Sequence, residues 1–125
     1  SVNDHVGAFW DLLPTFCELA GADIPAGIDG HSLVPTLTGQ GEQPIHDYLY
    51  WEFHEQGGKQ AVRRGDWKGV RLNVLENPGG PIELYYLPDD PGETTDVARR
   101  HPEIVADMAR LMEEARTPSE VFSFR

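Results

Sequence analysis

One stretch of the chain, residues 48–71, constrains the fold more than any other. It begins with the alternating segment YLYWEF, passes through the polar, glycine-containing segment HEQGG, and returns as two further β-prone segments. A period of two is typical of a strand with two different faces, and Leu49, Trp51 and Phe53 share one of them. The dipeptide Gly65-Asp66 favours a tight antiparallel hairpin, because glycine accepts positive φ at little cost. The sequence therefore predicts strands at 47–53, 59–64 and 67–72.

The remaining segments complete a small α+β fold. Residues 82–87 predict a fourth strand that ends at Pro88, and Pro102 opens a helix that Pro118 closes. Apolar residues in that helix recur at spacings of one, three and four, which gives one stripe to lay across the sheet: Ile104, Val105, Met108, Leu111, Met112 and Ala115. We expect a small antiparallel sheet of about four strands packed against this C-terminal helix, preceded by a short N-terminal helix.

The N-terminal part differs in composition and predicts a separate segment. Residues 11–20 fit a helix with Asp11 as its cap and Gly21 as its end, and a helical turn is expected at 32–37, where Ser32 can cap and Gly39 stops it. Between these elements the chain is dense in glycine and proline. We therefore divide the chain into residues 1–45, a helix and connector, and residues 46–125, the sheet with its helix.

Charge and composition exclude several classes of function. The chain of 125 residues has 21 acidic against 10 basic residues and a net charge of -11, so nucleic acid and anionic membrane surfaces would be repelled. No segment approaches the ~20 continuous apolar residues of a membrane span, and the N-terminus lacks the pattern of a signal peptide. The one cysteine, Cys17, excludes an internal disulfide and is expected to be a buried small hydrophobic residue.

The loop after the first strand carries the candidate binding residues His54 and Lys59. They flank Gly57-Gly58, which lets the backbone turn sharply or approach a ligand closely, and Glu55, Gln56 and Gln60 lie beside them. An imidazole and an ammonium can donate to anionic and hydroxyl oxygens of a ligand. From the residues alone, a solvated hairpin loop remains the competing interpretation.

Other residues that suggest chemistry have simpler interpretations. Trp51 and Trp67 could stack on a sugar ring, but alternating strand positions favour a core role. The acidic group at 89–96 lacks the ligand spacing of a helix-loop-helix calcium site and is expected to be a solvated turn. The scattered histidines form no helical pair and have no cysteine partners, so a zinc site is not expected.

Motifs spread over nearly the whole chain resemble the C-terminal portion of the sulfatase family. In order they are D-x-x-P-T with L-A-G at 11–21, D-G-H-S-L with P-x-L-x-G at 29–39, A-V-R-x-G-x-W-K at 61–68, E-L-Y at 83–85, D-P-x-E at 90–93 and H-P-E at 101–103. Each fragment alone is weak, and their order and spacing carry the resemblance.

The resemblance implies an enzyme of the alkaline-phosphatase-like superfamily that hydrolyses sulfate esters. Such enzymes use a calcium ion and a formylglycine made from a C/S-x-P-x-R motif, and both belong to the larger N-terminal domain. Cys17 is followed by Glu-Leu-Ala and the motif occurs nowhere in this sequence, so no catalytic or metal-binding residue carries over. The implied partners are a catalytic domain outside these residues and a sulfated substrate, carbohydrate included.

These observations predict a supporting C-terminal subdomain of a sulfatase, in which His54 and Lys59 help line the substrate pocket. The competing prediction is a free-standing glycan- or protein-binding module, and an independent small hydrolase would need a nucleophile and base that are not evident. The full-length protein would be periplasmic or secreted if it carries a signal peptide. The apolar surface around Phe9 and Trp10 also predicts a homodimer of the isolated 125 residues at high concentration.

Overall fold

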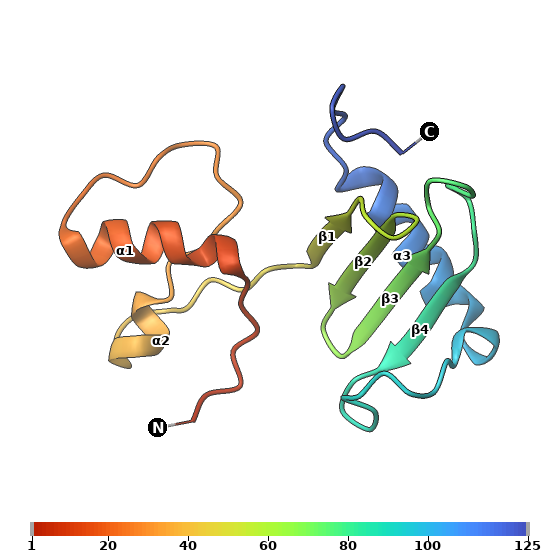
Figure 1. Ribbon diagram of the computed structural model, residues 1–125. Helices are drawn as coiled ribbons and strands as arrows, with labels where there is room; N and C mark the ends of the chain where they lie inside the picture. The colour runs from red at the N-terminus through yellow and green to blue at the C-terminus, as the bar shows by residue number, and fades with distance from the viewer. Residues whose placement is uncertain (1, 125) are drawn as a thin grey trace. The chain divides into compact units, whose positions relative to one another are not determined.

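The computed structural model describes residues 2–124 and divides into two compact units, Ser1–Asp47 and Tyr48–Arg125 (Figure 1). The first unit holds the 3-10 helix η1 (Phe9–Asp11), α1 (Leu12–Ala20) and α2 (Val34–Thr38). The second holds β1 (Leu49–Phe53), β2 (Lys59–Arg64), β3 (Trp67–Leu72), β4 (Ile82–Tyr86), the 3-10 helix η2 (Ala98–Arg100) and α3 (Pro102–Glu114). The predicted α+β class is confirmed. None of the helices within residues 2–124 is long and apolar enough to cross a bilayer.

Asp11 organises the first unit, but it is not the helix cap that the sequence predicted. Because η1 runs directly into α1, Asp11 has helical backbone angles and makes no side-chain capping bond to α1. Its fully buried carboxylate accepts the backbone N–H of Ala8 (2.7 Å) and of His31 (2.8 Å) and lies 2.8 Å from Nε2 of His46. Burial disfavours the charge, but these three donors outweigh it and hold the pKa of Asp11 below its ordinary value.

The helices of this unit end at the predicted glycines, and Cys17 is less buried than predicted. Gly21 and Gly39 follow α1 and α2 in the left-handed conformation, with φ of 66° and 69°. Leu13 and Phe16 are 50% and 60% exposed, and Cys17 is half-buried instead of fully buried as predicted. The exposed side chains of α1 leave self-association of the isolated chain as a prediction.

The second unit is a four-stranded antiparallel sheet in the order β1-β2-β3-β4. Arg64 pairs with Trp67 across the Gly65-Asp66 turn, and Gly65 has φ of 56°, which confirms the predicted hairpin. The bounds predicted for β2 and β3 are those observed. β1 begins two residues later than predicted, and β4 ends one residue earlier.

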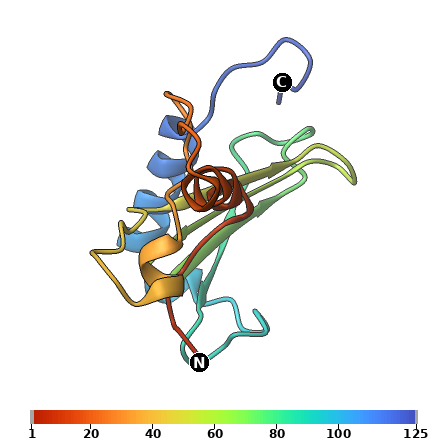
Figure 2. The same ribbon diagram turned by 90° about the vertical axis from the view of Figure 1, so that its left-hand side faces the viewer.

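α3 covers one face of this sheet (Figure 2). Met108, Leu111 and Met112 are buried against the helix-side row of paired residues Tyr50, Val62, Gly69 and Leu84. The approach is closest at Gly69, where an added Cβ would lie 3.0 Å from Cβ and Cγ of Met108. The predicted apolar stripe of the last helix is thus confirmed.

The opposite face of the sheet, called here the outer face, carries the strand face that holds Leu49, Trp51 and Phe53. It consists of Leu49, Trp51, Phe53, Lys59, Ala61, Arg63, Lys68, Val70, Leu72, Glu83 and Tyr85. Trp51 is 37% exposed, so its predicted core role is wrong, because α3 packs on the Val62 face. Trp67 is partly buried against the core, as predicted.

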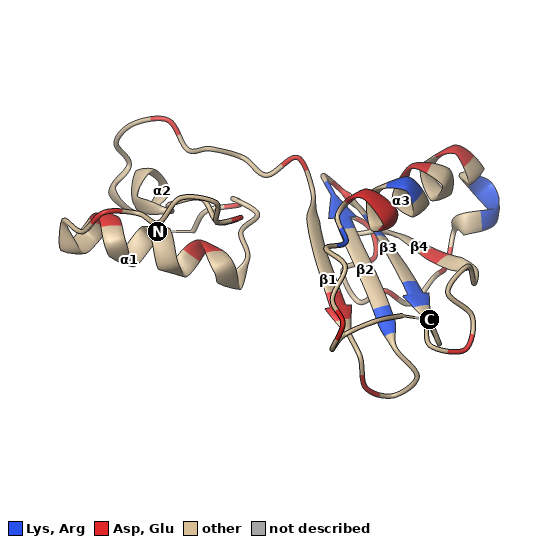
Figure 3. Ribbon diagram, turned by 90° about the horizontal axis from the view of Figure 1, so that it is seen from above, with Lys and Arg blue, Asp and Glu red and all other residues tan. Residues whose placement is uncertain are grey.

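Charge is distributed unevenly over the chain (Figure 3). All ten Lys and Arg residues fall in residues 59–125. The side of α3 turned away from the sheet carries charged residues, with Arg110 bonded to Asp107 and Glu114. The two sides of the second unit therefore differ: the solvent side of α3 is charged, and the outer face of the sheet carries both apolar and charged residues.

Candidate functional site

Residues 54–58, the rim loop, connect β1 to β2 and hold an unusual backbone conformation. Gln56, Gly57 and Gly58 all have positive φ, of 53°, 85° and 78°. The carbonyls of Gly57 and Gly58 accept the backbone N–H groups of Leu75 (3.0 Å) and Val74 (3.1 Å), which follow β3. The rim loop is therefore bonded to the neighbouring loop and is not a free hairpin tip.

His54 is held at the helix-side edge of the rim loop. Its Nε2 lies 3.0 Å from Oε2 of Glu52, and its ring stacks on Phe124 with centroids 4.3 Å apart and planes 5° apart. A tilted contact with Phe122 completes the enclosure. About a quarter of the side chain, 24%, remains exposed, which leaves one edge for a ligand.

Lys59 lies on the other side of the sheet from these partners. Its Nζ donates to Oε1 of Gln56 (2.9 Å) and sits 5.6 Å from the centre of the Phe53 ring. The structure thus places His54 and Lys59 at the same end of the β1–β2 hairpin but gives them separate supports. Whether both contact a substrate stays a prediction.

Glu52 anchors a polar cluster beneath the rim loop that sequence reasoning missed. Its Oε1 accepts the Tyr50 hydroxyl and lies 3.0 Å from Nε of Arg116. Gln60 donates to Tyr50 (2.9 Å) and accepts from Arg71 (3.2 Å). Burial, and then the bond to Glu52, raises the pKa of Tyr50 well above its ordinary value, so the hydroxyl remains a donor. No local pattern could reveal this cluster, because Arg116 lies far from Glu52 in the sequence.

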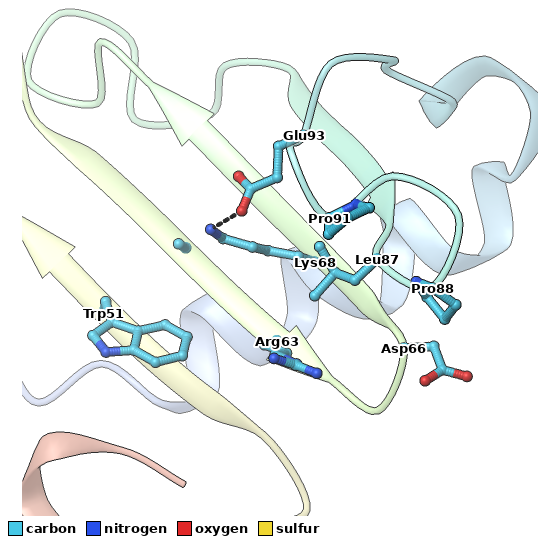
Figure 4. A pocket seen from close by; sticks show the side chains of 9 residues that line it. Trp51, Arg63, Asp66, Lys68, Leu87, Pro88, Pro91 and Glu93 are labelled. Carbon is cyan, nitrogen blue, oxygen red and sulfur yellow. Dashed lines mark hydrogen bonds and ion pairs between the residues drawn. The ribbon is translucent and has the colours of Figure 1, made fainter. Parts of the chain in front are cut away.

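The outer face is hollowed between β1 and the turn that follows β4 (Figure 4). The hollow measures about 660 Å³ and is lined by Trp51, Ala61, Arg63, Asp66, Lys68, Leu87, Pro88, Pro91 and Glu93. Lys68 is bonded to Glu93, and Nε of Arg63 donates to the carbonyl of Gly65 (3.2 Å). The hairpin register could have indicated this surface, since pairing Arg64 with Trp67 puts Arg63 and Lys68 on the same face.

The carboxylates after β4 are engaged by the protein itself. Asp90 accepts the backbone N–H groups of Thr94 and Thr95, which lower the pKa of that carboxyl, and Asp96 accepts those of Leu84 and Ala98. Within residues 2–124, no three His, Cys, Asp or Glu side chains lie close enough to hold a metal ion. The calcium ion that the sulfatase resemblance implies is expected in the larger N-terminal domain and not at these carboxylates, and it remains a prediction.

Comparison with known proteins shows which family the chain resembles. A family model described as N-sulphoglucosamine sulphohydrolase, C-terminal, matches residues 1–118. Delta 4,5-hexuronate-2-O-sulfatase of Bacteroides thetaiotaomicron is 35% identical over 113 residues, which cover 88% of this chain and 24% of that protein. Arylsulfatase K of Danio rerio is 29% identical over 112 residues, which cover 82% of this chain and 20% of that protein.

A solved structure described as a 2-O GAG sulfatase has the same fold over most of this chain. It superposes with a TM-score of 0.72 at 33% identity, covering 84% of this chain and 23% of that one. The chain thus spans about a quarter or less of the length of these relatives. Since the family model extends over residues 1–118 of 125, the chain belongs to the sulfatase family described as N-sulphoglucosamine sulphohydrolase, C-terminal.

Proposed function

We propose that the chain works as the C-terminal part of a longer sulfatase, where it supports the catalytic part and shapes the substrate cleft without supplying the nucleophile or the metal. The formylglycine and calcium of the reaction would belong to the rest of that polypeptide. The names of the relatives, which include a hexuronate sulfatase and a GAG sulfatase, favour a sulfated carbohydrate as the substrate.

The observation that best supports a role in shaping the cleft is that the rim loop and its side chains are held in place by contacts within this unit. Gly57 and Gly58 are bonded to the β3–β4 loop, His54 is held by Glu52 and Phe124, and Lys59 is held by Gln56. Residues ordered before binding lose little conformational entropy when a ligand arrives. An imidazole and an ammonium so fixed can recognise hydroxyl and anionic oxygens of a sugar sulfate.

The outer face supports the second role, docking onto the catalytic part. Phe53 and Leu72 are 47% and 39% exposed there, on the same face of the sheet as Arg63 and the hollow. Aromatic residues and arginine are enriched in protein interfaces, and an apolar sheet face is stabilised when another layer covers it. The charged side of α3 suits water better, so the outer face is the surface that a catalytic domain would cover.

One set of full-length variants tests the rim. His54→Ala and Lys59→Ala should each raise KM for a 2-O-sulfated unsaturated uronate disaccharide by about 10-fold, since each loses one ligand hydrogen bond of about 1.5 kcal/mol. His54→Phe keeps the stacking but removes the ring nitrogens, so it should raise KM equally. Arg99→Ala, which removes a charge outside the site, is the control. KM unchanged in all three rim variants would refute the rim role.

The same set tests docking when Leu72→Ala is compared with Leu75→Ala. These leucines are 39% and 40% exposed, and only Leu72 lies on the outer face. If the catalytic part covers Leu72, its truncation should lower the Tm of the full-length protein clearly more than that of Leu75, because a buried Leu→Ala change costs about 2–5 kcal/mol. Equal Tm values would argue against docking through this face.

A further inference from the structure

The contact with Glu52 decides which ring nitrogen of His54 carries the hydrogen. The inference drawn from it rests on the proposed function of the rim loop. Nε2 of His54 lies 3.0 Å from Oε2 of Glu52. A carboxylate oxygen only accepts hydrogen bonds, so Nε2 must carry the hydrogen in this contact. Nδ1 is then the unprotonated nitrogen of the neutral ring.

The other oxygen of Glu52 cannot easily take over this role. Oε1 accepts the Tyr50 hydroxyl, and Nε of Arg116 lies 3.0 Å from it. The raised pKa of Tyr50 keeps that hydroxyl a donor. The Arg116 Nε–H is buried and is not aligned for a hydrogen bond with any described residue, so its contact with Glu52 is an ion pair. With Oε1 engaged twice, Oε2 is left for His54.

The segment after α3 fixes the plane of the same imidazole. Phe124 stacks on the ring at 4.3 Å and Phe122 packs against it at 5.3 Å. Arg116 ties this segment to the cluster, because its Nη2 donates to the carbonyl of Phe122 (2.8 Å) and its guanidinium lies 5.3 Å from the Phe124 ring. Glu52 and Arg116 therefore act on His54 from two sides of one cluster.

We propose that Glu52 and Arg116 are positioning residues that hold His54 with Nε2 protonated and Nδ1 turned to the ligand. In the neutral ring Nδ1 is an acceptor, which matches a sugar hydroxyl and not a sulfate oxygen. Lys59, an ammonium with donors only, then recognises the anionic group. The rim divides its recognition into a hydroxyl contact at His54 and an anion contact at Lys59.

The test joins a spectroscopic readout to kinetics. In ¹⁵N NMR of the 125-residue chain at alkaline pH, the two ring nitrogens of His54 should show Nε2 protonated and Nδ1 unprotonated. Glu52→Gln, whose side-chain amide can either donate or accept, should produce a mixture of tautomers. In the full-length protein it should raise KM for the uronate disaccharide about 5-fold or more, with kcat within two-fold. Arg116→Met should act in the same direction.

Glu83→Gln is the matched control, since Glu83 accepts the Tyr85 hydroxyl two residues away, just as Glu52 accepts that of Tyr50. It should leave the His54 tautomer unchanged. If His54→Ala raises KM while Glu52→Gln alters neither tautomer nor KM, the positioning role is overturned and the proposed rim function stands. If Glu52→Gln mixes the tautomers while His54→Ala leaves KM unchanged, the proposed function fails and with it the hydroxyl contact.

Discussion

Replacing Gly69 with alanine tests how closely α3 is packed on the sheet. The new Cβ would lie 3.0 Å from Cβ and Cγ of Met108 and 3.2 Å from Cγ2 of Ile82, all closer than ordinary contact. Overpacking of this kind costs about 1–3 kcal/mol, while alanine in a strand regains roughly 0.5–1 kcal/mol over glycine. The net expectation is a loss of about 1–2 kcal/mol.

The measurement is urea unfolding of the second unit, followed by tryptophan fluorescence and by helical circular dichroism. In a parallel thermal melt, at roughly 4–8 °C per kcal/mol for a domain of this size, Tm should fall by about 4–16 °C. Gly79→Ala is the control, since no atom lies within 4 Å of its added Cβ, and it should be neutral or stabilise by about 0.4–1 kcal/mol. Equal midpoints for the two variants would show that α3 is not seated as closely as described.

Two further predictions concern the first unit and the rim loop. The lowered pKa of Asp11 means that its stabilising effect is complete above its ordinary pKa and is lost as pH falls through the folded value, so the amide signals of Ala8 and His31 should shift only below about pH 4. Asp11→Asn should abolish that shift and destabilise the unit by about 2–4 kcal/mol, and an unchanged titration would contradict the assignment. Gly58→Ala should destabilise the second unit more than Gly65→Ala, because both have positive φ but only at Gly58 would the new Cβ meet Leu75 (2.9 Å) and Phe124 (3.0 Å); similar unfolding midpoints would speak against a docked rim loop.

Much of the sheet could be predicted because its signals are local. The dipeptide Gly65-Asp66 sets the hairpin, and once Arg64 faces Trp67 every later pair of β2 and β3 follows. The stripe of α3 was predictable for the same reason, since a period near 3.6 is contained within a few turns.

The side of the sheet that α3 covers was not predictable from one strand. Leu49, Trp51 and Phe53 form a more apolar row than Tyr50 and Glu52, yet the row that packs against α3 is the one that continues through Val62 and Leu84. The alternation of residues in one strand defines two faces but does not show which of them is buried. The buried face depends on strands that lie later in the sequence and pair with this one.

The candidate site was predictable only in its loop. Gly57-Gly58 indicated a turn with His54 and Lys59 beside it, but the ring is fixed by Arg116 and Phe124, more than 60 residues later in the numbering. The predicted cap role of Asp11 was wrong for the same reason, because the fold brings His31 and His46, which lie far along the sequence, to its carboxylate.

The separate supports of His54 and Lys59 have a consequence for how substrate preference can change. Mutations at Tyr50, Glu52 or the chain end after α3 would alter one contact, while mutations at Phe53 or Gln56 would alter the other. If His54 and Lys59 make the two contacts proposed above, the accepted sugar could be exchanged by mutation without losing affinity for its acidic substituent.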